Sequence, residues 1–193
     1  EIKLISDFIP HNKVANIIKT TGIKKIYRIA KKEDLITLSY KACKKIISKK
    51  NNHHIDGLIL LTQSPKYNIP SNSFVLHKML NLKKECMVFD INLGCSGYVY
   101  ALSLANAFFK SKQLKKILII TGDTYSKYCK KLNVKIIFSD CATATIVSAS
   151  NNKKIKFQFY SDGAKSEYLK QESSNYKKTI DENSLEMNGV NVF

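Results

Sequence analysis

Short apolar runs alternate with amphipathic segments along this chain, and this alternation constrains the fold more than any other feature. Three runs, Ile55–Thr62, Cys86–Asn92 and Lys116–Gly122, are continuously apolar or nearly so. Strands of this kind are covered on both faces, as in sheets flanked by helices. The intervening segment Asp34–Lys49 carries apolar residues three and four positions apart, which is typical of a helix. Pro70–Leu80 is also expected to be a helix, because Pro70 suits a first turn and Ser71 or Ser73 can cap it. We therefore predict an α/β fold with a mixed sheet sandwiched between helices.

Further segments fill the rest of this prediction. Glu1–Ile9 and Ile136–Ser148 are expected to be strands, and Cys95–Lys110 is so apolar that we expect a helix covered on most sides. Lys154–Tyr160 alternates strictly, which predicts a strand with one wet face. Residues 163–185 are polar and are expected to form a long loop. A length of 193 residues suits one domain.

The cysteines and the apolar runs exclude several classes of protein. No apolar run reaches the ~18 residues that a membrane span needs, and no secretory signal peptide is recognisable. The cysteines are odd in number and form no C-x-x-C pair, so we expect neither a disulfide framework nor a metal site. Free thiols indicate a reducing compartment, which predicts the cytoplasm. The five are Cys43, Cys86, Cys95, Cys129 and Cys141.

The formal net charge of +17 is open to two interpretations. Of the 32 basic residues only Arg28 is an arginine, and the lysines are scattered along the chain, which is consistent with a compositional bias of the source. The functional alternative is attraction to an acidic carrier protein or to a phosphate-bearing cofactor. Nucleic-acid binding is not expected, because recognition of bases and phosphates favours the bidentate guanidinium.

Cys95 is the candidate nucleophile. It lies between a predicted buried strand and a predicted buried helix, in DINLGCSGYVYAL. A position in the first turn of that helix would place its sulfur at the positive end of the helix dipole, which stabilises a thiolate. Gly94 and Gly97 would let backbone or substrate come close. The spacing alone equally allows Cys95 to be a small core residue, as we expect for the other four cysteines.

These residues lead to a family. Asp90, Cys95, Ser96, Gly97 and Tyr98 match, in register, a motif of the ketoacyl synthase III branch of the thiolase-like condensing enzymes. A Thr-Gly-Ile precedes this motif, and TGD, FSDCATATIV and SDGA follow it in the order of the family. The chain thus resembles the N-terminal half of a thiolase-like fold over residues 1–193. The resemblance implies that the second half lies outside this chain.

The resemblance also implies a reaction. In this family the cysteine accepts an acyl group from acyl-CoA, and the acyl-enzyme then condenses with malonyl on acyl carrier protein, with loss of CO2. By resemblance, Cys95 is the catalytic nucleophile, acyl-CoA or acyl-carrier-protein thioesters are substrates and not permanently bound cofactors, and the partners are an acidic acyl carrier protein and a second copy of the chain. These 193 residues alone are expected to be inactive in condensation. The alternatives are an acyltransferase without decarboxylation and a non-catalytic, dimerising subunit.

Several positions depart from the family pattern. The Trp and Arg that hold the CoA adenine are absent, since the chain has no Trp and Thr20 stands in place of the Arg, so the acyl donor and the CoA site stay open. Phe138 matches a position that lines the acyl pocket. Ile69 replaces an aromatic residue that reaches the acyl pocket of the partner subunit in some relatives, and its smaller side chain favours a longer or branched acyl group.

Overall fold

A computed structural model describes residues 1–48, 52–129, 131–150, 155–171 and 186–188. The chain divides into two compact units. We call Lys31–Asp123 with Cys141–Phe157 the sheet unit. We call Glu1–Ala30 with Thr124–Asp140 and Gln158–Phe193 the terminal unit. Each unit is described by itself below.

The sheet unit contains a four-stranded sheet in the order β4-β3-β5-β6. Strand β3 (Gly57–Leu61) lies between β4 (Met87–Ile91) and β5 (Lys116–Asp123) and is parallel to both. Strand β6 (Cys141–Ser148) is antiparallel to β5. The sheet is therefore mixed, as the sequence predicted.

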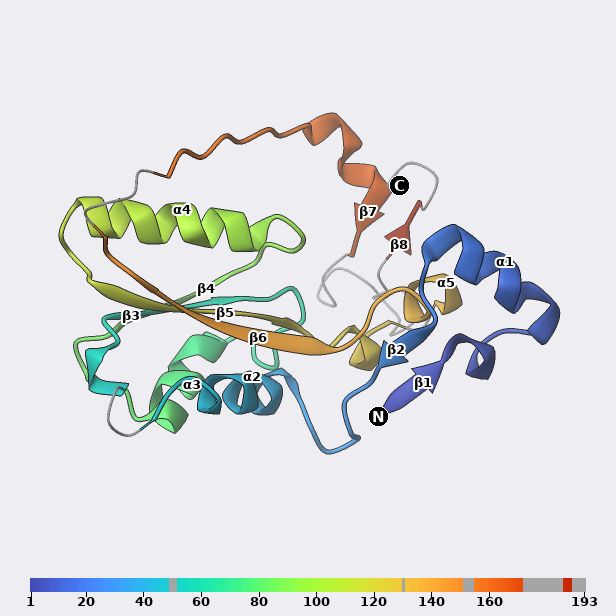
Figure 1. Cartoon of the computed structure of the whole chain (residues 1–193), viewed down its shortest axis with the longest axis horizontal. Helices are drawn as coiled ribbons and strands as arrows, with labels where there is room; N and C mark the ends of the chain where they lie inside the picture. The colour runs from blue at the N-terminus through green and yellow to red at the C-terminus, as the bar shows by residue number, and fades with distance from the viewer. Residues whose placement is uncertain (49–51, 130, 151–154, 172–185, 189–193) are drawn as a thin grey trace. The chain divides into compact units, whose positions relative to one another are not determined.

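Helices cover both faces of this sheet. Helices α2 (Leu35–Lys44) and α3 (Asn72–Leu80) lie on one face and α4 (Gly97–Lys110) on the other (Figure 1). Alternate residues of the central strands enter opposite cores, which explains why the strands are apolar throughout. Leu58, Leu60, Leu118 and Ile120 pack with α2 and α3, whereas Ile59, Leu61, Ile117 and Ile119 pack with α4.

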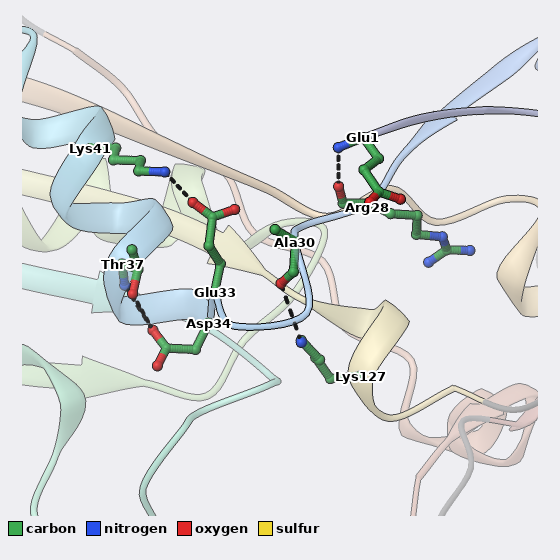
Figure 2. A network of polar contacts seen from close by, with 8 residues as sticks. All are labelled: Glu1, Arg28, Ala30, Glu33, Asp34, Thr37, Lys41 and Lys127. Atoms are coloured by element: carbon green, nitrogen blue, oxygen red, sulfur yellow. Dashed lines mark hydrogen bonds and ion pairs between the residues drawn. The ribbon is translucent and has the colours of Figure 1, made fainter.

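Helix α2 starts at a well-defined cap. The carboxylate of Asp34 accepts the backbone N–H of Thr37 at 2.8 Å and its hydroxyl at 2.9 Å (Figure 2). It also pairs with the ammonium of Lys66, N to O at 2.7 Å, and Lys41 on α2 pairs with Glu33. Partial burial acts to raise the pKa of Asp34, but the bonds from Lys66 and Thr37 outweigh it and hold this pKa below its usual range.

The terminal unit is organised around a buried carboxylate. Asp140 accepts the backbone N–H groups of Ile29 and Ser126, each at 2.9 Å, and its own N–H donates to the Tyr27 carbonyl at 2.8 Å. Strands β1 (Ile2–Leu4) and β2 (Lys25–Tyr27) pair antiparallel here, and Figure 2 shows the amino terminus of Glu1 donating to the carbonyl of Arg28. The remaining helices and strands of this unit are α1 (His11–Thr21), α5 (Leu132–Lys135), the 3-10 turns Ile5–Asp7, Tyr125–Lys127 and Gly163–Tyr168, and the paired strands β7 (Leu169–Lys170) and β8 (Glu186–Met187).

Two predicted strands are shorter in the structure than the sequence indicated, because an apolar, buried run can form either a strand or a helix. The strand predicted over Glu1–Ile9 stops at Leu4, and Ile5 and Ile9 instead point into the core of the terminal unit from a turn. The strand predicted over Ile136–Ser148 begins only at Cys141. Ile136 directly follows α5 and packs in that same core.

Two further segments near the end of the chain differ from the prediction where the structure describes them. Residues 155–160 form no strand, because alternation is a local property whereas a strand needs a partner to pair with. The predicted loop of residues 163–185 begins with the 3-10 turn Gly163–Tyr168, where the Asp162 side chain accepts the Ala164 N–H at 3.1 Å, and continues into β7. Residues 172–185 of that loop lie outside the described residues. Among the helices that the structure describes, none has the length and apolar character to cross a membrane.

Candidate functional site

Cys95 lies in the turn that joins β4 to α4. The N–H of Gly97 donates to the carbonyl of Gly94 at 2.6 Å and closes this turn, Ser96 is the N-cap, and α4 begins at Gly97. Cys95 therefore precedes the N-cap. The sequence had predicted a position in the first helical turn, and this prediction was wrong. It is exposed. The thiol stands beside the N-terminal end of a 14-residue helix, where the dipole favours a negative charge.

Gly97 determines how closely α4 approaches the sheet. A Cβ at this position would lie 2.8 Å from Cδ2 of Leu61 at the end of β3, which is closer than packed carbon atoms approach. The glycine thus brings the start of α4, and with it Cys95, against the carboxyl end of the parallel strands. Ligand sites of open α/β sheets lie at this edge.

Helix α4 is less covered than the sequence predicted. Its fully buried residues are Gly97, Ala101 and Ala105, all small, which pack on the sheet. Val99 and Leu104 are 47% and 39% exposed, so an apolar face of the helix points away from the sheet. The prediction that this helix is covered on most sides was therefore wrong for the described part of the chain, although the helix is strongly apolar.

The other cysteines divide into two groups. Burial raises the pKa of Cys43 to about 12 and that of Cys86 to about 11, so both remain protonated at neutral pH. Cys129 is buried in the terminal unit. Cys141, at the start of β6, is exposed, in contrast to the core position expected from the sequence. Among the described residues, no three His, Cys, Asp or Glu side chains gather as a metal site.

Asp90, the first residue of the family motif, holds the segment that carries Ile69. Its Oδ1 accepts the N–H of Ser73 at 2.8 Å and its Oδ2 that of Asn72 at 2.6 Å. Oδ1 of Asn72 in turn accepts the N–H groups of Lys66 and Tyr67, at 3.0 and 3.1 Å. Ile69 projects from this fixed segment and is 89% exposed. Its side chain is available to a second molecule, and its role in an acyl pocket stays a prediction.

Phe138, the other predicted pocket residue, belongs to the terminal unit. Its ring lies 5.3 Å from that of Tyr125, centroid to centroid, and packs in a cluster with Cys129 and Val134. It is partly buried. This packing leaves its role as an acyl-pocket residue a prediction.

Asp123 is a residue of the site whose role the sequence did not reveal. It ends β5, and its Oδ1 accepts three hydrogen bonds from residues 62–64, which follow β3. The TGD motif marked the residue, and an acidic side chain closing a buried strand is a signal for such an anchor. The partners themselves lie about 60 residues earlier in the chain and were not predictable.

Comparison with known proteins shows which family the chain is similar to. The sequence model described as 3-Oxoacyl-[acyl-carrier-protein (ACP)] synthase III matches residues 89–163. Beta-ketoacyl-[acyl-carrier-protein] synthase III 1 of Vibrio vulnificus is 33% identical over 182 residues, which are 92% of this chain and 57% of the relative. The corresponding synthase III of Clostridium tetani is 36% identical over 174 residues, 86% of this chain and 51% of the relative. The chain thus spans about half the length of these relatives.

Solved structures agree with this result. A crystal structure of a 3-oxoacyl-(acyl-carrier-protein) synthase III superposes with a TM-score of 0.90 at 29% identity, covering 100% of this chain and 65% of the other. The Aquifex aeolicus synthase III gives a TM-score of 0.84 at 26% identity, covering 100% and 62%. The chain has the thiolase-like fold of these proteins, and over about half of their length it is similar to members of the 3-oxoacyl-[acyl-carrier-protein] synthase III family.

Proposed function

We propose that this chain supplies the acyl-accepting part of a 3-oxoacyl-[acyl-carrier-protein] synthase III, with Cys95 as the nucleophile. The observation that carries the proposal is the exposure of Cys95 where β4 meets α4. Cys43 and Cys86 are buried with raised pKa values and do not compete. A thiolate beside a helix N-terminus is a suitable nucleophile for acyl transfer.

The first half-reaction is a transfer between thioesters. The Cys95 sulfur attacks the carbonyl carbon of an acyl thioester, a new C–S bond forms, and the donor leaves as a thiol that carries the Cys95 proton. Negative charge develops on the carbonyl oxygen in the transition state, and the positive end of α4 stabilises it. The N–H of Gly97 is already committed to the Gly94 carbonyl, so further donors are needed there.

The second half-reaction needs donors for an enolate oxygen. In the proposed chemistry, malonyl on the carrier protein loses CO2, the enolate carbon attacks the acyl-cysteine carbonyl, and the Cys95 thiolate leaves. By resemblance to the family, a His and an Asn stabilise the enolate. His77 does not fit this role, because it lies on α3, across the sheet from α4, and its Nε2 contacts the Lys83 carbonyl at 2.9 Å. We therefore propose that the enolate donors come from the part of the family's length that this chain does not match.

The test is mass spectrometry of the protein after incubation with an acyl-CoA. We expect one acyl adduct, on the peptide that contains Cys95, which is lost in Cys95→Ala and kept in Cys141→Ala. We expect no 3-oxoacyl product from these 193 residues alone when malonyl-carrier protein is added. An adduct on Cys141, or an adduct that survives Cys95→Ala, contradicts the assignment.

We also propose two macromolecular partners. An acidic acyl carrier protein suits the net charge of +17. A second copy of the chain suits the sheet, because β4 pairs only with β3 among the described residues and leaves one edge open. Met87, Val88, Phe89 and Ile91 are only partly buried along it. A two-fold axis there would join two sheets through antiparallel β4 strands.

A further inference from the structure

The segment that follows β3 is tied to the ends of two neighbouring strands. Oδ1 of Asp123 accepts the Thr62 hydroxyl at 2.9 Å, the Gln63 backbone N–H at 2.8 Å and the Ser64 hydroxyl at 2.9 Å. The N–H of Thr62 donates to the carbonyl of Ile91, the last residue of β4, at 3.1 Å. Gln63 is thereby fixed at the carboxyl edge of the sheet by its own backbone.

The side chain of Gln63 reaches the turn that holds Cys95. A Cβ built on Gly94 would overlap Oε1 of Gln63 and lie 3.0 Å from its Cδ, so the carboxamide fills the space that the glycine leaves open. The carbonyl of Gly94 accepts the N–H of Gly97, and Cys95 lies between the two. The Gln63 carboxamide therefore contacts this turn at the residue that precedes the candidate nucleophile.

We propose that Gln63 is a positioning residue for Cys95, with Asp123 as its anchor. Its carboxamide rests against Gly94 and fixes the turn that orients the Cys95 sulfur relative to the start of α4. This proposal rests on the proposed function of Cys95. A nucleophile on a turn needs such support, since a displacement of about 1 Å costs up to ~100-fold in rate.

The substitutions follow from this geometry. Gln63→Ala removes the carboxamide, and we expect Cys95 to be acylated about 10-fold or more slowly, with an unchanged thermal midpoint because the side chain is exposed. Gln63→Met keeps the length without the amide and should retain more of the rate than Gln63→Ala. Gln63→Glu keeps the shape but adds a negative charge against the turn that holds Cys95, so the pH midpoint of Cys95 alkylation should move upward. A residue that served only the stability of the fold would not move this midpoint.

Gly94 provides the coupling test. Gly94→Ala should slow Cys95 in the wild-type background, where the new methyl group displaces the carboxamide, and much less in the Gln63→Ala background, where the space is empty. Gln113→Ala is the matched control, since this exposed glutamine follows the opposite end of α4. We expect the control to react like the wild type.

The measurement is the rate of Cys95 modification by iodoacetamide, read peptide by peptide, beside the rate of acylation by acyl-CoA. The proposal is supported if the Gln63 and Gly94 substitutions are strongly non-additive and Gln63→Glu shifts the pH profile. It is overturned if Gln63→Ala and Gln63→Glu alkylate at the wild-type rate and midpoint, or if the two sites are additive. Wild-type protein that alkylates at Cys95 but accepts no acyl group contradicts the proposed function, and the alkylation rates still decide the role of Gln63.

Discussion

Asp90 caps helix α3: its Oδ2 accepts the backbone N–H of Asn72 at 2.6 Å, and the Asn72 amide donates to the same oxygen at 3.2 Å. Asp90 lies near the end of β4, five residues before Cys95. One carboxylate therefore orders the start of α3 and the loop before it, and does so next to the turn of the candidate nucleophile. This capping explains why the motif has an Asp at position 90, and it requires no role for Asp90 in the chemical reaction.

The capping predicts a large loss of stability on truncation. Asp90→Ala leaves the N–H groups of Asn72 and Ser73 without their acceptor, and both residues are buried. We expect the free energy of unfolding to fall by about 1–3 kcal/mol, measured by urea denaturation. Asp90→Asn keeps one acceptor oxygen and should lose less. Glu85→Ala, at an exposed position just before β4, is the control. An equal, small effect of Asp90→Ala and Glu85→Ala contradicts the capping role.

Acid sensitivity should depend on Asp34 and Asp56. Partial burial acts to raise the pKa of Asp56, but hydrogen bonds from Lys83, at 2.5 Å, and from the backbone N–H groups of Lys115 and Lys116 outweigh it and hold this pKa below 3.8. The pKa of Asp34 is likewise lowered. The unfolded chain therefore binds protons more readily, and the stabilisation is complete above pH 3.8 and lost as the pH falls below it.

The double variant Asp34→Asn, Asp56→Asn tests this dependence. It should be less stable than the wild type at pH 7 and should lose less further stability between about pH 5 and pH 2. Thermal midpoints across this range measure both effects. Lys84→Met, which removes an exposed charge, is the control and should keep the wild-type slope. A double variant with the full wild-type acid slope shows that other groups control the acid transition.

Alkylation should separate four of the five cysteines by exposure and by ionisation. We expect iodoacetamide at neutral pH to label Cys95 first, followed by the exposed Cys141. Cys43 and Cys86 should resist labelling until the protein unfolds, because burial raises their pKa values to about 12 and about 11. Peptide mass spectrometry over time gives the order, with a Cys141→Ser variant to remove the second reactive site. Labelling of Cys43 before Cys95 in folded protein rules out this ranking.

The sequence predicted those parts of the fold in which the local residues alone show how the segment is buried or capped. Ile59 and Leu60 point to opposite faces of the sheet and are both fully buried, so the continuous apolar sequence predicted a strand between two layers of helices. The start of α2 was equally readable, because Asp34 caps it with a local bond to Thr37. Such features depend on neighbours in the chain.

The parts that the sequence did not predict depend on distant neighbours. Residues 155–160 have the alternation of a strand but form none, and alternation does not reveal whether a partner strand is available. The contact of Gln63 with Gly94 joins residues about 30 positions apart, and Asp123, which anchors Gln63, lies about 60 positions after Gln63. Cys95 stays a candidate nucleophile, and the sequence did not predict that this residue lies before the N-cap Ser96.

The open edge of β4 predicts a dimer that should be disrupted when a single backbone N–H on this edge is removed. In a parallel pair, alternate residues bond to the neighbouring strand, and the N–H of Met87 donates to Asp56 at 2.9 Å while the carbonyl of Ile91 accepts from Thr62. By this alternation the N–H of Phe89 points to β3 and that of Val88 to the open edge. Val88→Pro therefore removes a donor that only a second molecule would use, and proline is tolerated at an edge.

We expect the protein to be a dimer at micromolar concentration and Val88→Pro to be a folded monomer. Phe89→Pro is the matched contrast, since it removes a donor to β3 and should unfold the sheet unit. Light scattering coupled to gel filtration gives the mass, and far-UV circular dichroism shows whether each variant is folded. A wild type that is monomeric at this concentration rules out the pairing. A Val88→Pro variant that is folded and still dimeric places the interface on another surface, because the β4 edge would then lack one of the main-chain bonds that the pairing needs.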